Sequence, residues 1–156
     1  MVRAIDNDES GPVTSSHPIY TPSAATQTLP FVRSVVRDLL KLRETIDAQR
    51  KQLKVVDKLP ETISQPEYED ELSDMRRSLR ADEDRLNACL QELRSLGVET
   101  KDPFDGHVDF PAMLNRRPIR LCWEPEDETV SYWHEINENS DQRKKIDHAM
   151  LTALAT

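Results

Sequence analysis

The chain has 156 residues, of which 32% are charged and only 5% are aromatic, and its formal net charge is −8. This length suits one domain, and the composition favours long exposed helices over a large globular core. An acidic chain does not fit a general nucleic-acid binder, because phosphate contacts require clustered lysine and arginine.

Localisation follows from what the composition lacks. No apolar stretch approaches the roughly 20 residues that cross a bilayer, and the N-terminus has no apolar core of a signal peptide. The two cysteines, Cys89 and Cys122, form neither a CxxC pair nor an even-numbered framework. They are typical of reduced thiols, and we expect a cytoplasmic protein outside the membrane.

The chain begins with residues 1–19, which mix polar residues, Gly and Pro without periodicity and predict a disordered lead-in. A helix then starts at Thr21-Pro22, because Thr21 can cap and Pro22 fits the first turn. Pro30 lies inside the same helical stretch, where its ring and missing N–H predict a kink or a restart.

Residues 20–97 predict an antiparallel helical hairpin that resembles a coiled coil. Apolar residues alternate at spacings of three and four over 29–53 and again over 72–96, as expected for a two-helix seam. The polar connector 58–65 separates the two arms, and Gly97 is the expected stop. The seam positions are Leu29, Val32, Val36, Leu39, Arg43, Ile46, Arg50 and Leu53, then Leu72, Met75, Leu79, Asp82, Leu86, Cys89, Leu93 and Leu96.

The charges of the two arms predict how they pair. Residues 31–58 carry a basic surplus and residues 66–96 an acidic surplus, so the arms attract each other. Folding the chain so that Leu53 faces Leu72 also places Arg43 opposite Asp82. We expect this pair to fix the hairpin register, as polar seam residues do elsewhere.

After Gly97 the period changes to short extended runs. Residues 98–136 predict a small antiparallel β unit with strands at 119–123 and 129–134, joined by a loop at 125–128. Residues 137–156 predict a polar link and a short tail helix, with Ser140 as its cap. The predicted fold class is therefore α+β: a long helical hairpin, a small antiparallel β unit and a short C-terminal helix.

Three runs in the second half form a recognisable set: 108–112 (VDFPA), 121–123 (LCW) and 132–135 (YWHE). Together with the hairpin and Leu96-Gly97-Val98, they resemble a bacterial family known as domain of unknown function 2203. The resemblance covers about Tyr20 to Ile136 and implies a small protein without an assigned activity, substrate or cofactor. His107 and the tail after Ile136 depart from the family pattern.

The same runs contain candidate metal ligands. In an enzyme interpretation, His134 and Asp109 hold a zinc ion, Cys122 is the third ligand and Glu135 is the general base. Their spacing matches no standard zinc motif. A four-residue loop would pair Glu124 with Thr129 and put Cys122 and His134 on opposite sheet faces, whereas a slip of one residue would put them on the same face.

These observations favour a structural role, rather than a catalytic or metal-binding one, for most candidates. We expect His134 to be a hydrogen-bonded core histidine, Cys122 a small buried hydrophobe, and Arg120 a cation over Trp133. The basic stripe of Arg33, Arg37 and Lys41 has no interleaved aromatics, which disfavours nucleic acid.

The sequence thus predicts a cytoplasmic interaction or structural module without a cofactor. The apolar residues off the seam predict a homodimer through the helical arms. They are Val35, Leu40, Leu42 and Leu90. The alternative is a zinc-dependent enzyme, a hydrolase, that uses His134, Asp109 and Cys122.

Overall fold

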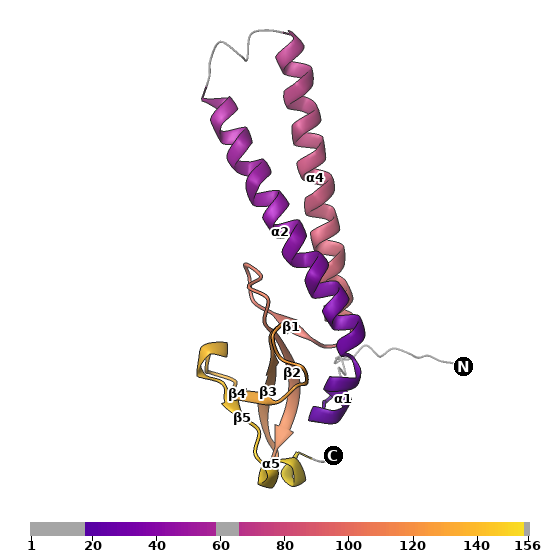
Figure 1. The fold of residues 1–156 in the computed structure, drawn as a ribbon, viewed down its shortest axis with the longest axis vertical. Coiled ribbons are helices and arrows are strands. Elements are labelled where there is room, and N and C mark those ends of the chain that lie inside the picture. Colours follow the sequence, from indigo (N-terminus) through magenta and orange to yellow (C-terminus); the bar gives the residue numbers. More distant parts are fainter. Residues whose placement is uncertain (1–17, 59–65, 155–156) are drawn as a thin grey trace, which may run out of the picture.

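The computed structural model describes residues 18–58 and 66–154. Most of the predicted lead-in and most of the connector lie outside this range. Two long helices pack side by side, followed by a five-stranded antiparallel sheet and a short C-terminal helix. Figure 1 shows the hairpin projecting well beyond the sheet, which lies against its base. The predicted α+β class is confirmed.

Two short-range signals set the start of the hairpin. Helix α1 (Pro22–Gln27) begins at Thr21, whose side chain accepts from the N–H of Ala24 at 3.1 Å. The helix is interrupted at Thr28, and helix α2 (Leu29–Asp57) then begins with Pro30 in its first turn. The predicted restart at Pro30 is confirmed, because proline is tolerated only where no intrahelical N–H is needed.

Helix α4 (Pro66–Ser95) returns along α2, and two ion pairs join the arms: Arg50 to Glu83 at 2.7 Å and Arg76 to Asp57 at 3.0 Å. The predicted pairing of Arg43 with Asp82 is wrong. The Arg43 guanidinium donates to the carbonyl of Phe104, in the loop after the first strand.

Asp82, although buried, is satisfied by other donors. Gln49 Nε2 donates to it at 3.0 Å and Arg85 Nη1 at 2.6 Å. A buried carboxylate requires such partners, and here Gln49 supplies one from across the seam and Arg85 another from the same helix.

The sheet has the order β1 (Glu99–Thr100), β2 (Val108–Leu114), β3 (Arg117–Trp123), β4 (Tyr132–Glu135) and β5 (Lys144–Lys145). Strand β2 was not among the predicted strands, and it contains Pro111 although proline is rare in a strand interior. Strand β1 pairs only with Val108 and Asp109, so Pro111 lies where β2 is an edge and no ladder donor is needed. The turn to β3 has positive φ at Asn115 and Arg116, as a two-residue hairpin requires.

The predicted register of β3 with β4 is wrong by one residue. Arg120 faces His134 and Cys122 faces Tyr132, rather than Ile119 facing His134. The connection between β3 and β4 is longer than the predicted loop at 125–128. Arg33 of α2 binds it by donating to the carbonyls of Asp127 and Glu128, both at 2.9 Å. A slip of one residue exchanges the two faces of a strand, and here it moves His134 to the face of Cys122.

The core lies between the hairpin base and one face of the sheet. Phe110, Leu121 and Trp123 fill it from the strands, and Val32 and Leu39 fill it from α2. The same core covers residues that the sequence assigned to a dimer contact: Val35 is buried, and Leu40 and Leu90 pack against the cluster.

The tail crosses the far edge of the sheet. A single 3₁₀ turn, η2 (Ser140–Gln142), precedes helix α5 (His148–Ala153). The cap of α5 is Asp147, which accepts from the N–H of Met150 at 2.9 Å, so the prediction of Ser140 as cap is wrong. Within the described residues, none of the helices is both long and apolar enough to cross a membrane.

Candidate metal centre

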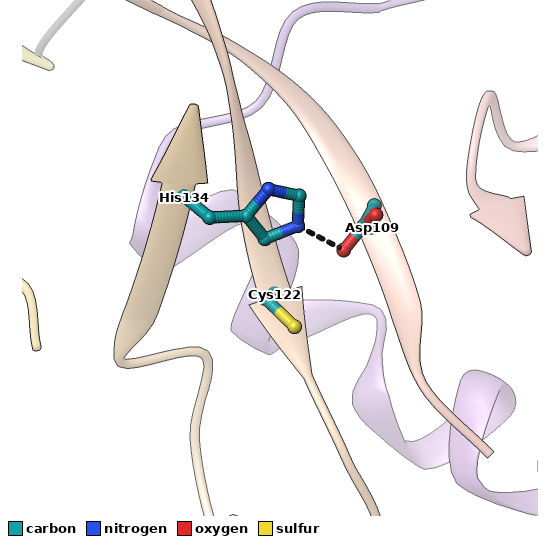
Figure 2. Close-up of side chains that lie close together, drawn as sticks. All are labelled: Asp109, Cys122 and His134. Carbon is teal, nitrogen blue, oxygen red and sulfur yellow. Dashed lines mark hydrogen bonds and ion pairs between the residues drawn. The ribbon is translucent and has the colours of Figure 1, made fainter. Parts of the chain in front are cut away.

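The face of the sheet away from the core carries the chemically active side chains. Side chains alternate along a strand, and with Phe110 and Leu121 in the core, Asp109 and Cys122 point the other way. The corrected register adds His134 from β4. Figure 2 shows the three side chains on neighbouring strands, with the His134 ring reaching over β3 towards Asp109. Their ligand atoms all lie within 4.8 Å of one another.

His134 is held by both ring nitrogens. Its side chain is 4% exposed, Nδ1 lies 2.7 Å from the carbonyl oxygen of Glu135, and Nε2 lies 3.1 Å from Oδ1 of Asp109. A carbonyl oxygen can only accept, so Nδ1 carries the proton. In a neutral imidazole, Nε2 would then direct its lone pair at a carboxylate oxygen. Two acceptors at this distance require a positive group between them, either a proton or a metal ion.

The other two members of the cluster, Asp109 and Cys122, lie in an environment that disfavours charge. Burial raises the pKa of the Asp109 carboxyl, the nearby Glu99 raises it further, and His134 opposes the shift without cancelling it. Burial and the Asp109 carboxylate raise the pKa of the Cys122 thiol to about 12. The thiol therefore keeps its proton at neutral pH in the absence of a stronger Lewis acid.

A family model described as "Uncharacterized conserved protein (DUF2203)" matches residues 18–146, which include the whole hairpin, the sheet and the three clustered side chains. The chain belongs to the DUF2203 family. No curated protein and no solved structure matches it.

Three further polar residues of this DUF2203 chain, Glu135, His107 and Arg120, bind other partners. Glu135 points to the opposite face, where Arg117 binds its carboxylate at 2.8 and 3.1 Å, so its side chain is not the base of this site. His107 binds Glu124 at 2.7 Å, outside the cluster. Arg120 pairs with Glu99 at 2.7 Å, so the predicted cation–π contact with Trp133 is wrong.

Sequence reasoning missed several residues around the DUF2203 cluster. The cation over Trp133 is Lys144, at 4.4 Å from the ring centroid. Arg143 stacks on Tyr132, the cross-strand neighbour of Cys122, at 3.9 Å. Glu138 closes the turn after β4 by accepting from the N–H of Glu135 at 2.9 Å. The Lys144 and Arg143 contacts depend on how the tail returns to the sheet, which no local sequence pattern predicts.

The donor set fits a transition metal. Bond lengths of about 2.0–2.3 Å from zinc to oxygen, nitrogen and sulfur place tetrahedral donor atoms roughly 3.3–3.6 Å apart. The separation of 3.1 Å between His134 and Asp109 is already that short. The Nδ1–H bond to a carbonyl leaves Nε2 as the metal-binding nitrogen, which is how zinc-bound histidines are usually oriented.

Proposed function

We propose that this protein binds one transition-metal ion, zinc by the chemistry of its donors, through Asp109, Cys122 and His134. The observation that carries the proposal is the convergence of a carboxylate, a thiol and an imidazole nitrogen within 4.8 Å. Zinc takes oxygen, sulfur and nitrogen donors of this kind.

The charge balance of the cluster supports a divalent ion. Without metal, one proton lies between His134 and Asp109 and a second stays on Cys122, so the cluster is neutral overall. A divalent ion that displaces both protons leaves a neutral imidazole, a carboxylate and a thiolate around it, and the total charge is unchanged. The exchange therefore places no net charge in a site where burial already penalises charge.

The enzyme alternative depends on the fourth coordination position. Three protein ligands leave one position for water or substrate, and solvent reaches the cluster at Asp109, which is 27% exposed. Glu99 is the cross-strand neighbour of Asp109, but Arg120 binds its carboxylate at 2.7 Å, so it does not replace Glu135 as the general base. A cleft of ≈ 830 Å³ between the hairpin and β1 is lined by Glu99 and Pro111 but by none of the three clustered side chains.

Metal analysis tests the proposal. Protein made without a histidine tag and purified without chelator should carry about one equivalent of zinc, and His134→Ala should lose it. His107→Ala is the matched control, because it removes a neighbouring histidine outside the cluster and should keep the metal. Protein that holds no metal even after zinc is added would reduce the cluster to a His–Asp ion pair that braces the sheet.

The hairpin favours a second function, as an interaction arm that pairs with a second copy of the chain. Beyond the sheet, the arms bury few apolar side chains, among them Ile46, Leu53 and Leu72. Val55 and Tyr68, near the distal end, are 62% and 40% exposed. Exposed apolar residues on a long, thinly packed helical pair favour cover by another protein.

A further inference from the structure

The turn that follows β4 is hydrogen-bonded to the His134 ring. The carbonyl oxygen of Glu135 accepts two hydrogen bonds, from the N–H of Glu138 at 3.0 Å and from His134 Nδ1 at 2.7 Å. In return, the N–H of Glu135 donates to Oε1 of Glu138 at 2.9 Å. Residue 138 therefore closes the turn from both ends, with its backbone and with its side chain.

The Glu138 carboxylate is itself held in place. Lys144 Nζ donates to the same Oε1 at 2.8 Å, and Lys144 lies over the ring of Trp133, its cross-strand partner. The Lys144 hydrogen bond and the Glu135 N–H lower the pKa of Glu138, so the carboxylate is ionised at neutral pH. A charged acceptor fixed against the sheet edge makes the turn rigid.

We propose that Glu138 is a positioning residue for the metal ligand His134: by closing the turn it holds the Glu135 carbonyl against Nδ1 and so directs Nε2 at Asp109 and Cys122. The inference rests on the metal-binding function proposed above. Partners of this kind fix the tautomer and orientation of a ligating histidine, and their loss weakens metal affinity by about 10–100-fold.

The chain contains a matched control for this turn. Four residues further on, the N–H of Asn139 donates to Oε1 of Gln142 at 2.9 Å, and the N–H of Gln142 donates to the Asn139 carbonyl at 3.0 Å. This second turn repeats the side-chain and backbone bonds of the first, but the two ring nitrogens of His134 bind Glu135 and Asp109 rather than any of its residues. A substitution there reports the general effect of loosening the link between β4 and β5.

The test compares Glu138→Ala, Glu138→Gln and Gln142→Ala. Zinc affinity is measured by competition with a chromophoric chelator, and the His134 tautomer in metal-free protein is read from long-range ¹H–¹⁵N NMR correlations. Glu138→Ala should weaken zinc binding by about 10–100-fold and reduce the population protonated at Nδ1. Glu138→Gln keeps an oxygen acceptor and should rescue the tautomer, and Gln142→Ala should match wild type in both measurements.

The outcomes separate this inference from the proposed function. If wild type binds zinc and Glu138→Ala keeps both its affinity and its tautomer, Glu138 has no positioning role although the metal site stands. If wild type binds no zinc but the tautomer changes in Glu138→Ala, the positioning role stands and the metal function fails. Should Glu138→Ala not fold, Glu138→Asp, whose carboxylate falls one methylene short of the Glu135 N–H, makes the same comparison.

Discussion

His134 Nε2 lies 3.1 Å from Oδ1 of Asp109, although the two residues are 25 positions apart and β3 runs between their strands. Because Nδ1 donates to the Glu135 carbonyl, this short distance requires a cation between the ring and the carboxylate. A proton fills that role in the metal-free protein, and a metal ion has to displace it. The competition between proton and metal gives the site measurable properties.

Zinc affinity should rise with pH. The pKa of Cys122 is raised to about 12, so the thiol is protonated across the neutral range and must release its proton to bind metal. Each proton displaced makes the apparent affinity increase about tenfold per pH unit. Isothermal titration calorimetry in buffers of different ionisation enthalpy should give about two protons released per zinc, from the thiol and from the His134–Asp109 pair.

Cys122→Ser provides the control for this proton count. A serine hydroxyl is a poor zinc ligand and keeps its proton, so the variant should release one proton fewer and bind more weakly. An affinity that does not vary with pH in wild type would contradict displacement of a thiol proton.

The sequence identified the chemical types in this site but not their arrangement. Asp109, Cys122 and His134 were the candidate ligands, yet the predicted loop put Cys122 and His134 on opposite faces. The deciding contacts come from Arg33, which is 94 positions away from Asp127 and holds the carbonyls of the loop. The length of the loop alone does not predict the register of β3 with β4, because an arginine from another helix binds this loop.

The hairpin register gives a second prediction, on stability. Arg43 and Asp82 have separate partners, so the double-mutant cycle of Arg43→Leu with Asp82→Leu should give a coupling within about 0.3–0.5 kcal/mol of zero. The cycle of Gln49→Leu with Asp82→Leu should give a coupling of about 0.5–3 kcal/mol, because these side chains share a hydrogen bond. Urea denaturation of the two sets measures both values.

The opposite ranking would restore the sequence-based register. A large coupling for Arg43 with Asp82 and none for Gln49 with Asp82 would mean that the seam residues pair as the heptad pattern alone predicts. The pattern identified the hairpin because apolar spacing is a local property. It misplaced Arg43 because that side chain reaches the Phe104 carbonyl in a loop whose position is set by the sheet.

Association through the arms gives a third prediction. With Val35, Leu40 and Leu90 covered by the core, we expect the exposed Val55 and Tyr68 of the distal hairpin to contact a second copy. Sedimentation at micromolar to millimolar concentration should show association, and Val55→Glu together with Tyr68→Glu should weaken it. Ile136→Glu, at an exposed position on the β unit, is the control. A single 18.0 kDa species at every concentration would exclude the arms as a self-association surface.

The last prediction concerns what Asp109 costs the metal-free fold. Burial raises its pKa, so the folded protein binds the Asp109 proton more tightly than the unfolded chain does. This contribution to stability is present at low pH and is lost as the pH rises through the folded-state value. At neutral pH the wild-type protein therefore carries a penalty for the buried carboxylate, which the proton shared with His134 offsets only in part.

Asp109→Asn removes that penalty, and its new carboxamide can donate to His134 Nε2. Metal-free Asp109→Asn should therefore be more stable than wild type at neutral pH, on the order of 1 kcal/mol, with the difference shrinking as the pH falls. Zinc should stabilise wild type but not the variant. Urea denaturation at two pH values, with and without zinc, measures all of these, and Asp141→Asn at an exposed position is the control. A variant less stable than wild type at neutral pH would mean that the Asp109 charge braces the sheet through His134. A variant that gains stability and loses zinc would mean that the charge is retained for binding.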